Sequence, residues 1–159
     1  MLKLGERYRV EDLVPHRGRM CLLDSIDGYG EEWLSATVTI RADGMFCGPA
    51  GVPAWAGVEF MAQTAAAFGG IEQAQRGEAP SIGLLIGARY YRAVLDTFPI
   101  GMQLTVRAAI AMRDTQDFAA YDCCIESGAT RLAECVLKAY RPRDLAPILA
   151  GDFSGIRGG

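Results

Sequence analysis

The sequence predicts an α+β fold in which one curved antiparallel sheet wraps around a single long helix. One long helical pattern, rich in Ala, Met, Phe and Gln, occupies the middle of the chain. Strand patterns come before and after it, and the later ones are joined by short turns, which are the connections that antiparallel neighbours need. The chain has 159 residues, half of them hydrophobic, which suits one domain with a full core.

Two strands are predicted ahead of the long helix. Val10–Val14 is typical of a short helical stretch. Met20–Ser25 is short and apolar, which predicts the first strand, and Gly28 with Gly30 predicts a turn. In Trp33–Ile40 polar and apolar residues alternate and β-branched residues are common. This segment is therefore expected to be a half-buried strand, paired with the one before it.

The long helix is predicted from Ala54 to Arg76, with Gly77 as its C-terminal cap. Arg41–Pro53 before it contains three Gly and two Pro and is expected to be an irregular loop. Small and apolar residues recur along the helix at steps of three and four, at Val58, Met61, Ala62, Ala65, Ala66 and Gly69. Because so much of its surface is small and apolar, we expect other parts of the chain to pack closely around it.

After the helix the pattern returns to strands. The first of them contains two glycines and is expected to be bent; the others are separated by short polar turns. The four predicted strands are Ile82–Val94, Leu104–Met112, Phe118–Glu126 and Arg131–Tyr140.

This order of elements predicts the hotdog architecture. We expect one hotdog domain over residues 1–150, followed by a loose, glycine-rich tail over residues 151–159. The predicted sheet leaves an edge strand and part of the helix uncovered. Two copies paired edge to edge would cover both, so a dimer is expected.

Composition and charge exclude several classes of function. The net charge is −3 and no basic face is evident, which argues against a general nucleic-acid binder. No apolar run approaches the roughly 20 residues of a membrane span, and the N-terminus lacks an apolar signal core, so a cytoplasmic protein is expected. Five cysteines without a Cys-x-x-Cys pair and a single histidine predict free thiols and no metal site.

Glu59 and Gln63 are the polar residues that stand out in the long helix. Their spacing of four places them on one face. The helix N-terminus favours a charged Glu59, whereas its apolar neighbours oppose the charge, and a carboxylate under such opposed influences can act as a general acid or base. The alternative is that Glu59 only caps the helix or faces solvent.

Three further residue types could take part in chemistry. His16, the only histidine, is a catalytic candidate or a loop residue bonded to backbone. Cys47 has no histidine near it in sequence, which disfavours a nucleophilic role. Arg89 and Arg92 could meet an acidic partner or a phosphate, or lie at a solvated strand end.

Several of these residues resemble a known family. Pro15-His16-Arg17, followed by Leu22-Leu23-Asp24, is similar to the opening of the 3-hydroxyacyl-[acyl-carrier-protein] dehydratases, which are hotdog proteins. Their central helix carries an acidic residue and, four positions later, a Gln, as at Glu59 and Gln63. The resemblance covers roughly residues 10–141. The run Pro-Ala-Trp-Ala-Gly-Val-Glu-Phe-Met-Ala-Gln is more similar still to the ApeP-like dehydratase subunits of aryl polyene synthesis.

One position departs from the family pattern. The family's catalytic histidine falls on Met45, and a methionine cannot move a proton. Phe46 and Gly48 match the phenylalanine and the first glycine of the same loop. The resemblance implies that Met45, Phe46, Gly48 and Gln63 contact substrate and that a backbone amide near Gly48 faces the thioester carbonyl. Glu59 would act as the acid/base for the departing hydroxyl, and His16 could take the place of the missing base.

The resemblance implies dehydration of carrier-bound 3-hydroxyacyl thioesters to trans-2-enoyl thioesters. The substrate would arrive on the phosphopantetheine arm of an acyl carrier protein, with no further cofactor. The carrier is acidic, so its docking surface would involve the arginines Arg17, Arg19, Arg89 and Arg92.

Two rival functions stay open. A hotdog thioesterase could use a helix carboxylate without a histidine. An inactive subunit could stabilise an active partner and bind its acyl chain. In the dehydratases the histidine and the acidic residue come from different subunits. A homodimer would therefore lack the base, whereas a heterodimer with a histidine-containing subunit would complete one site.

Overall fold

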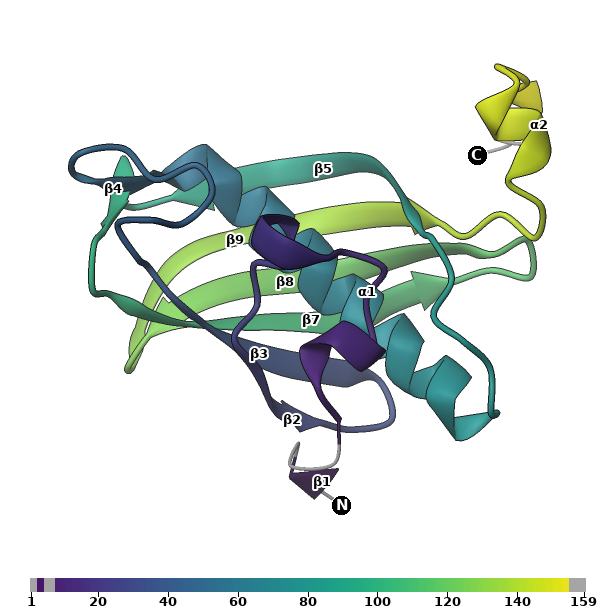
Figure 1. Ribbon diagram of the computed structural model, residues 1–159, viewed down its shortest axis with the longest axis horizontal. Coiled ribbons are helices and arrows are strands. Elements are labelled where there is room, and N and C mark those ends of the chain that lie inside the picture. Colours follow the sequence, from purple (N-terminus) through teal and green to yellow (C-terminus); the bar gives the residue numbers. More distant parts are fainter. Residues whose placement is uncertain (1–2, 5–7, 155–159) are drawn as a thin grey trace.

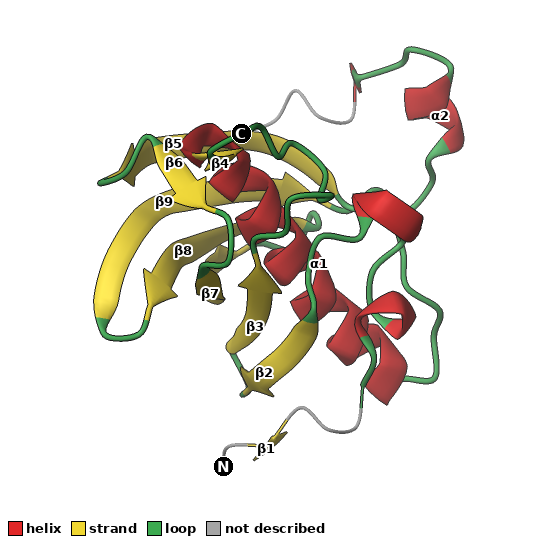
Figure 2. Ribbon diagram, turned by 60° about the vertical axis from the view of Figure 1, so that its left-hand side comes forward, coloured by secondary structure: helices red, strands yellow, loops and turns green. Residues whose placement is uncertain are grey.

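The computed structural model describes residues 3–4 and 8–154. Its centre is one long helix, α1 (Gly57–Gln75), lying across the concave face of a strongly curved sheet (Figures 1 and 2). The sheet is antiparallel throughout, in the order β1-β2-β3-β7-β8-β9-β5. The predicted α+β hotdog arrangement is confirmed. No helix within the described ranges is long and apolar enough to cross a membrane.

The seven strands of the main sheet differ in length, and the longest form its centre. In sheet order they are β1 (Lys3–Leu4), β2 (Ser25–Tyr29), β3 (Trp33–Thr39), β7 (Gln103–Arg113), β8 (Phe118–Ser127), β9 (Thr130–Tyr140) and β5 (Leu84–Ala93). The four strands expected after the helix are all present. β5 is irregular as predicted, since its pairing with β9 shifts register twice.

The long helix begins a little later than its pattern predicts. Residues 54–56 form a short 3-10 turn, η4 (Ala54–Ala56), and the α-helix starts at Gly57. Its buried face, which includes Phe60, Met61 and Phe68, packs against the strands. Gly57 lets the helix approach its neighbours, because an added Cβ would lie 2.9 Å from a methyl group of Ile125.

Two predictions about the first half of the chain are wrong. Met20–Ser25 is not a strand: a 3-10 turn, η3 (Gly18–Met20), ends there, and the strand begins only at Ser25. The helical stretch expected at Val10–Val14 is present as the 3-10 turn η2 (Val10–Asp12). The predicted turn is present at Gly30, whose amide donates to the Trp33 carbonyl at 2.8 Å, but Gly28 lies inside the strand at a register shift. The reason is long-range, since the backbone at residues 20 and 22 is bonded by a helix side chain instead of a neighbouring strand.

The glycine- and proline-rich loop ends in a strand that its pattern did not reveal. β4 (Gly51–Pro53) pairs with β6 (Thr97–Pro99) in a separate two-stranded sheet. Pro53 in β4 and Pro99 in β6 suit strands of this kind, because short edge strands leave some backbone amides unpaired. After β9 comes a single short helical turn, α2 (Ala146–Leu149), set apart from the sheet in Figure 1. Of the predicted tail, residues 155–159 lie outside the described residues.

Candidate active site

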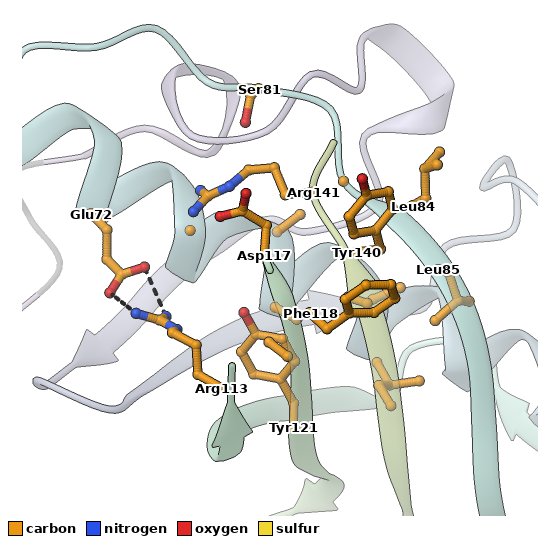
Figure 3. Close-up of a pocket in the computed structure, with 18 of the residues that line it drawn as sticks. Glu72, Ser81, Leu84, Leu85, Arg113, Asp117, Phe118, Tyr121, Tyr140 and Arg141 are labelled. Carbon is orange, nitrogen blue, oxygen red and sulfur yellow. Dashed lines mark hydrogen bonds and ion pairs between the residues drawn. The ribbon is translucent and has the colours of Figure 1, made fainter. Parts of the chain in front are cut away.

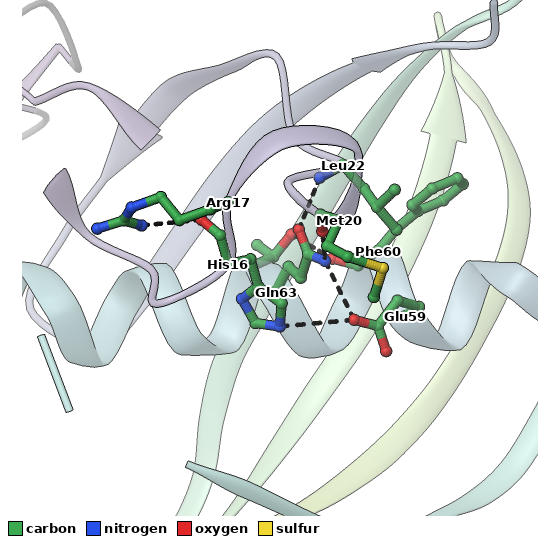
Figure 4. A network of polar contacts seen from close by, with 8 residues as sticks. His16, Arg17, Met20, Leu22, Glu59, Phe60 and Gln63 are labelled. Carbon is green, nitrogen blue, oxygen red and sulfur yellow. Dashed lines mark hydrogen bonds and ion pairs between the residues drawn. The ribbon is translucent and has the colours of Figure 1, made fainter. Parts of the chain in front are cut away.

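Glu59 lies in the first turn of α1 and is the centre of a small polar network (Figure 4). Its side chain is about one-third exposed. The Oε1 atom accepts a hydrogen bond of 3.1 Å from Gln63 Nε2 and lies 3.7 Å from His16 Nε2. Within the described part of the chain, Oε2 accepts no hydrogen bond. One carboxylate oxygen is therefore held in place and the other is open to a ligand.

Gln63 ties this network to the rest of the fold. Its side chain is completely buried. Besides the bond to Glu59, Nε2 donates to the Met20 carbonyl at 2.7 Å, and Oε1 accepts from the Leu22 amide at 2.9 Å. The amide orientation that satisfies both backbone groups is also the one that points an N–H at Glu59. Gln63 therefore fixes both the carboxylate and the segment that crosses above it.

His16 reaches Glu59 from that crossing segment. The segment lies close against the helix at Gly70, where an added Cβ would fall 2.1 Å from the Leu13 carbonyl oxygen. The Arg17 guanidinium donates to the carbonyls of Val14 and His16, at 2.6 and 2.8 Å. The imidazole Nδ1 is buried and finds no hydrogen-bond partner among the described residues. The two catalytic candidates, 43 residues apart, are thus neighbours in one chain.

A cavity of about 300 Å³ starts at this network and follows α1 toward its C-terminal end. Figure 3 shows the end of the cavity near Glu72. His16 and Glu59 line one part of it, and Glu72 lines another. At about 1.5 Å of rise per residue, Glu59 and Glu72 lie about 20 Å apart along the helix. The opposite wall comes from β8, β9 and β5. The lining residues follow the helix, so the cavity is elongated along α1, with Glu59 toward one end.

The small residues of the helix have two different neighbours. At Gly57 and Gly70 other parts of the chain pack closely, as predicted. Ala62, Ala65, Ala66 and Gly69 line the cavity. The three alanines also pack against the hydrophobic core, so the prediction of close packing holds on one side of them, and on the other side their small side chains leave room for the cavity.

The loop residues implied by the resemblance lie outside this cavity. Met45, Phe46 and Gly48 do not line it. Phe46 packs edge-to-face on the exposed Trp55, with ring centroids 5.6 Å apart. The Gly48 amide already donates to the Gly51 carbonyl at 2.8 Å, so it is not free in one chain to meet a thioester. Their role as substrate contacts stays a prediction.

The sequence patterns held no sign of the polar groups at the far end of the cavity. Glu72 of α1 and Arg113 of β7 form a bidentate ion pair with two hydrogen bonds, each 3.0 Å long. This pairing raises the pKa of Arg113, and burial raises the pKa of the adjacent Tyr121 phenol. Arg141, which follows β9, also lines the cavity. In the sequence each of these looks like an ordinary polar residue of a strand or helix face.

Among the described residues, no three His, Cys, Asp or Glu side chains lie close enough together to hold a metal ion. The pKa of the Cys21 thiol is raised, mainly because the thiol is partly buried. Cys47, whose nucleophilic role the sequence disfavours, donates to the carbonyl of Gly48 and does not line the cavity that contains Glu59.

Comparisons with known proteins agree with this fold. A family model described as ApeP-like, ApeP dehydratase, matches residues 8–150. A chain of the dehydratase heterocomplex ApeI:P from Xenorhabdus doucetiae is 26% identical, with a TM-score of 0.83, and the match covers 92% of this chain and 99% of that one. No curated protein sequence matches significantly.

More distant structures share the fold alone. An HP0420 homologue from Helicobacter felis is 15% identical with a TM-score of 0.62, covering 84% of this chain and 88% of that one. The E. coli PaaI protein of the phenylacetic acid degradation operon is 18% identical with a TM-score of 0.57, covering 73% and 81%. Since the family model spans nearly all of the described residues and a chain of a dehydratase complex shares the fold, this protein belongs to the ApeP-like family of hotdog dehydratases.

Proposed function

We propose that this chain is one half of a dehydratase that converts carrier-bound 3-hydroxyacyl thioesters to trans-2-enoyl thioesters, in synthesis of the aryl polyene or fatty-acid type. The observation that supports it best is Glu59, held by Gln63 and flanked by His16, at one end of a long cavity. A linear acyl chain could occupy the cavity and leave its 3-hydroxyl beside the carboxylate.

The reaction needs one base and one acid. The base removes a proton from C2, the C–H electrons form the double bond, and the C3–O bond breaks as the hydroxyl leaves with a donated proton as water. Glu59 in its protonated form is proposed as the acid, acting through Oε2, because Oε1 is engaged by Gln63. Such an acid typically contributes about a hundredfold to ten-thousandfold in rate.

His16 is proposed to serve Glu59 rather than to attack the substrate on its own. Its Nε2 lies 3.7 Å from Oε1, slightly beyond hydrogen-bond distance. A small movement would close that gap and let His16 donate a hydrogen bond to Oε1, which leaves the acid proton of Glu59 on Oε2. The contact between His16 and Glu59 also keeps the Glu59 side chain facing the cavity. With Met45 in the loop, the C2 proton still lacks a base in this chain.

We propose that a second, histidine-containing dehydratase subunit supplies that base across a dimer interface. The similar solved chain is part of a dehydratase heterocomplex, which supports this assembly. β5 is one of the two outer strands of the main sheet, and its exposed side chains include Leu85, Ile86 and Tyr90. An unpaired, apolar edge of this kind suits strand-to-strand pairing with a partner. Trp55 extends the apolar surface near the start of α1.

The carrier protein is proposed to dock beside the same face. Arg89 and Arg92 lie exposed on β5 and form no ion pair with the described residues. Arg17 donates to two backbone carbonyls, and Arg19 donates to the Asp43 carbonyl at 3.2 Å. Arg89 and Arg92 are therefore better placed to meet an acidic carrier, whose phosphopantetheine arm would deliver the substrate.

Product analysis tests the proposal. The purified chain, the histidine-containing subunit and their co-expressed complex are each incubated with a 3-hydroxyacyl carrier thioester. Enoyl product from the complex, with little from this chain alone, is the expected result. Free acid would identify a thioesterase. Enoyl product from the histidine-containing subunit alone, at the rate of the complex, would identify this chain as an inactive subunit. Enoyl product from this chain alone, lost in His16→Gln, would place the base in this chain and contradict the composite site.

A further inference from the structure

The end of the cavity farthest from Glu59 is polar, although its middle is lined by alanines. The Glu72–Arg113 ion pair lies there, together with the Tyr121 ring and Asp117 (Figure 3). Asp117 is itself paired, because the exposed Arg143 donates to it at 3.0 Å. Both of these carboxylates are therefore already bonded by arginines other than Arg141.

Arg141 is the polar group at this end that is left without a partner. Its side chain is half-buried and lines the cavity, and its backbone amide is fixed by a 3.0 Å bond to the Asp117 carbonyl. The guanidinium lies over Gly69 of the helix, where an added Cβ would be 3.7 Å from Nη1. Within the described residues, its side chain makes no hydrogen bond and no ion pair. A guanidinium carries five N–H donors, so this one has donors to offer a ligand.

An acyl chain ending in a methyl group would fit this end poorly. The methyl group would displace water from Arg141 and from the ion pair without replacing the hydrogen bonds that the water makes. Burying polar groups without hydrogen-bond partners costs free energy and would weaken binding. A hydroxyl oxygen would accept a hydrogen bond from Arg141 and so replace the hydrogen bond lost with the displaced water. A carboxylate is less suitable, because Glu72 and Asp117 lie at the same end.

We propose that Arg141 determines substrate specificity by binding a neutral oxygen, such as a hydroxyl, at the distal end of the acyl chain. This inference rests on the proposed function only in taking the cavity as the acyl site. It adds the substrate class: long acyl thioesters with a hydroxylated rather than a methyl terminus. Arg141 is distant from Glu59 and takes no part in the proton transfers.

Binding without turnover tests the inference separately from the dehydratase activity. Dodecanoyl-pantetheine, ω-hydroxydodecanoyl-pantetheine and the matching ω-carboxy thioester lack the 3-hydroxyl and cannot be dehydrated. Their dissociation constants are measured by calorimetry with the full chain. We expect the ω-hydroxy thioester to bind about tenfold more tightly than the methyl-ended one, the effect of one hydrogen bond to a charged group.

Two arginine variants complete the experiment. In Arg141→Met the ω-hydroxy and methyl-ended thioesters should bind equally. Arg131→Met is the matched control, since Arg131 is exposed at the opposite end of β9 and pairs with Glu126, and it should keep the preference. Equal binding of the two thioesters by the unmodified chain, or tighter binding of the ω-carboxy thioester, would overturn the inference. So would a preference that survives in Arg141→Met.

Discussion

At Gly70 the N-terminal segment packs directly against the helix. Replacing Gly70 by alanine should show whether the loss of this close packing outweighs the gain in helix propensity. A Cβ at Gly70 would lie 2.1 Å from the Leu13 carbonyl oxygen and 2.7 Å from its carbonyl carbon. Ordinary contacts between heavy atoms are near about 3.5 Å, so the backbone at Leu13 must move by roughly 1 Å. Leu13 and Val14 are buried, and the movement would disturb the core around them.

The expected loss follows from two opposing effects. Overpacking of this kind destabilises by about 1–3 kcal/mol, whereas alanine in place of glycine stabilises a helix interior by up to about 1 kcal/mol. Gly70→Ala should therefore lower the free energy of unfolding by about 1–2 kcal/mol. Gly69→Ala is the matched control. Its Cβ would meet only Arg141 Nη1 at 3.7 Å, so it should gain up to about 1 kcal/mol.

Urea unfolding followed by circular dichroism measures both changes. The two variants should differ in sign although they are neighbours in one helix. Gly70→Ala should also weaken dehydration by the complex, because the displaced segment carries His16 away from Glu59. Equal stabilisation of the chain by both substitutions would refute the close approach at Gly70.

Three further outcomes are expected. Gln63→Leu should lower the free energy of unfolding by about 2–4 kcal/mol in urea titrations, because it leaves two backbone groups at residues 20 and 22 unpaired; an unchanged midpoint would contradict this role. Burial raises the pKa of Tyr91 from 10.0 to about 12, so the folded state holds that proton more tightly. Its contribution to stability is complete below pH 10 and is lost as the pH rises toward about 12. In Tyr91→Phe, which also loses the hydrogen bond to the Ala54 carbonyl, pH-dependent unfolding should show a shallower decline over that range, and an identical decline would exclude Tyr91 as its source. Ile86→Lys places a charge on the exposed edge strand and should weaken subunit association in sedimentation experiments, whereas unchanged association would exclude this edge as the interface.

The parts of the fold predicted correctly are those with a strong local pattern. The long helix and the four strands after it are visible as periodic runs of about ten residues or more. Met20–Ser25 failed because it is apolar like a strand, yet its backbone bonds go to Gln63, 41 and 43 positions away. β4 could not be predicted because it is short, ends in Pro53 and pairs with a strand far along the chain.

The candidate site was predictable only in part, for a similar reason. Glu59 and Gln63 share a helix face, so their spacing alone predicts their contact. The approach of His16 depends on the fold of the N-terminal segment, and no local pattern encodes it. Alanines produce the same sequence pattern whether they touch a neighbour or line a cavity, so the channel along α1 could not be foreseen. Arg141 belongs to that channel only because β9 ends beside Gly69.

The central claim is that Glu59 of this chain supplies the acid of a site shared with a second subunit. The most direct measurement is the dehydration rate of the co-expressed complex carrying Glu59→Gln in this chain only, with the partner unmodified. The substitution keeps the shape of the side chain and removes its ionisable proton. The account predicts a loss of at least about a hundredfold with assembly intact. A complex that dehydrates at the full rate despite this change would contradict it.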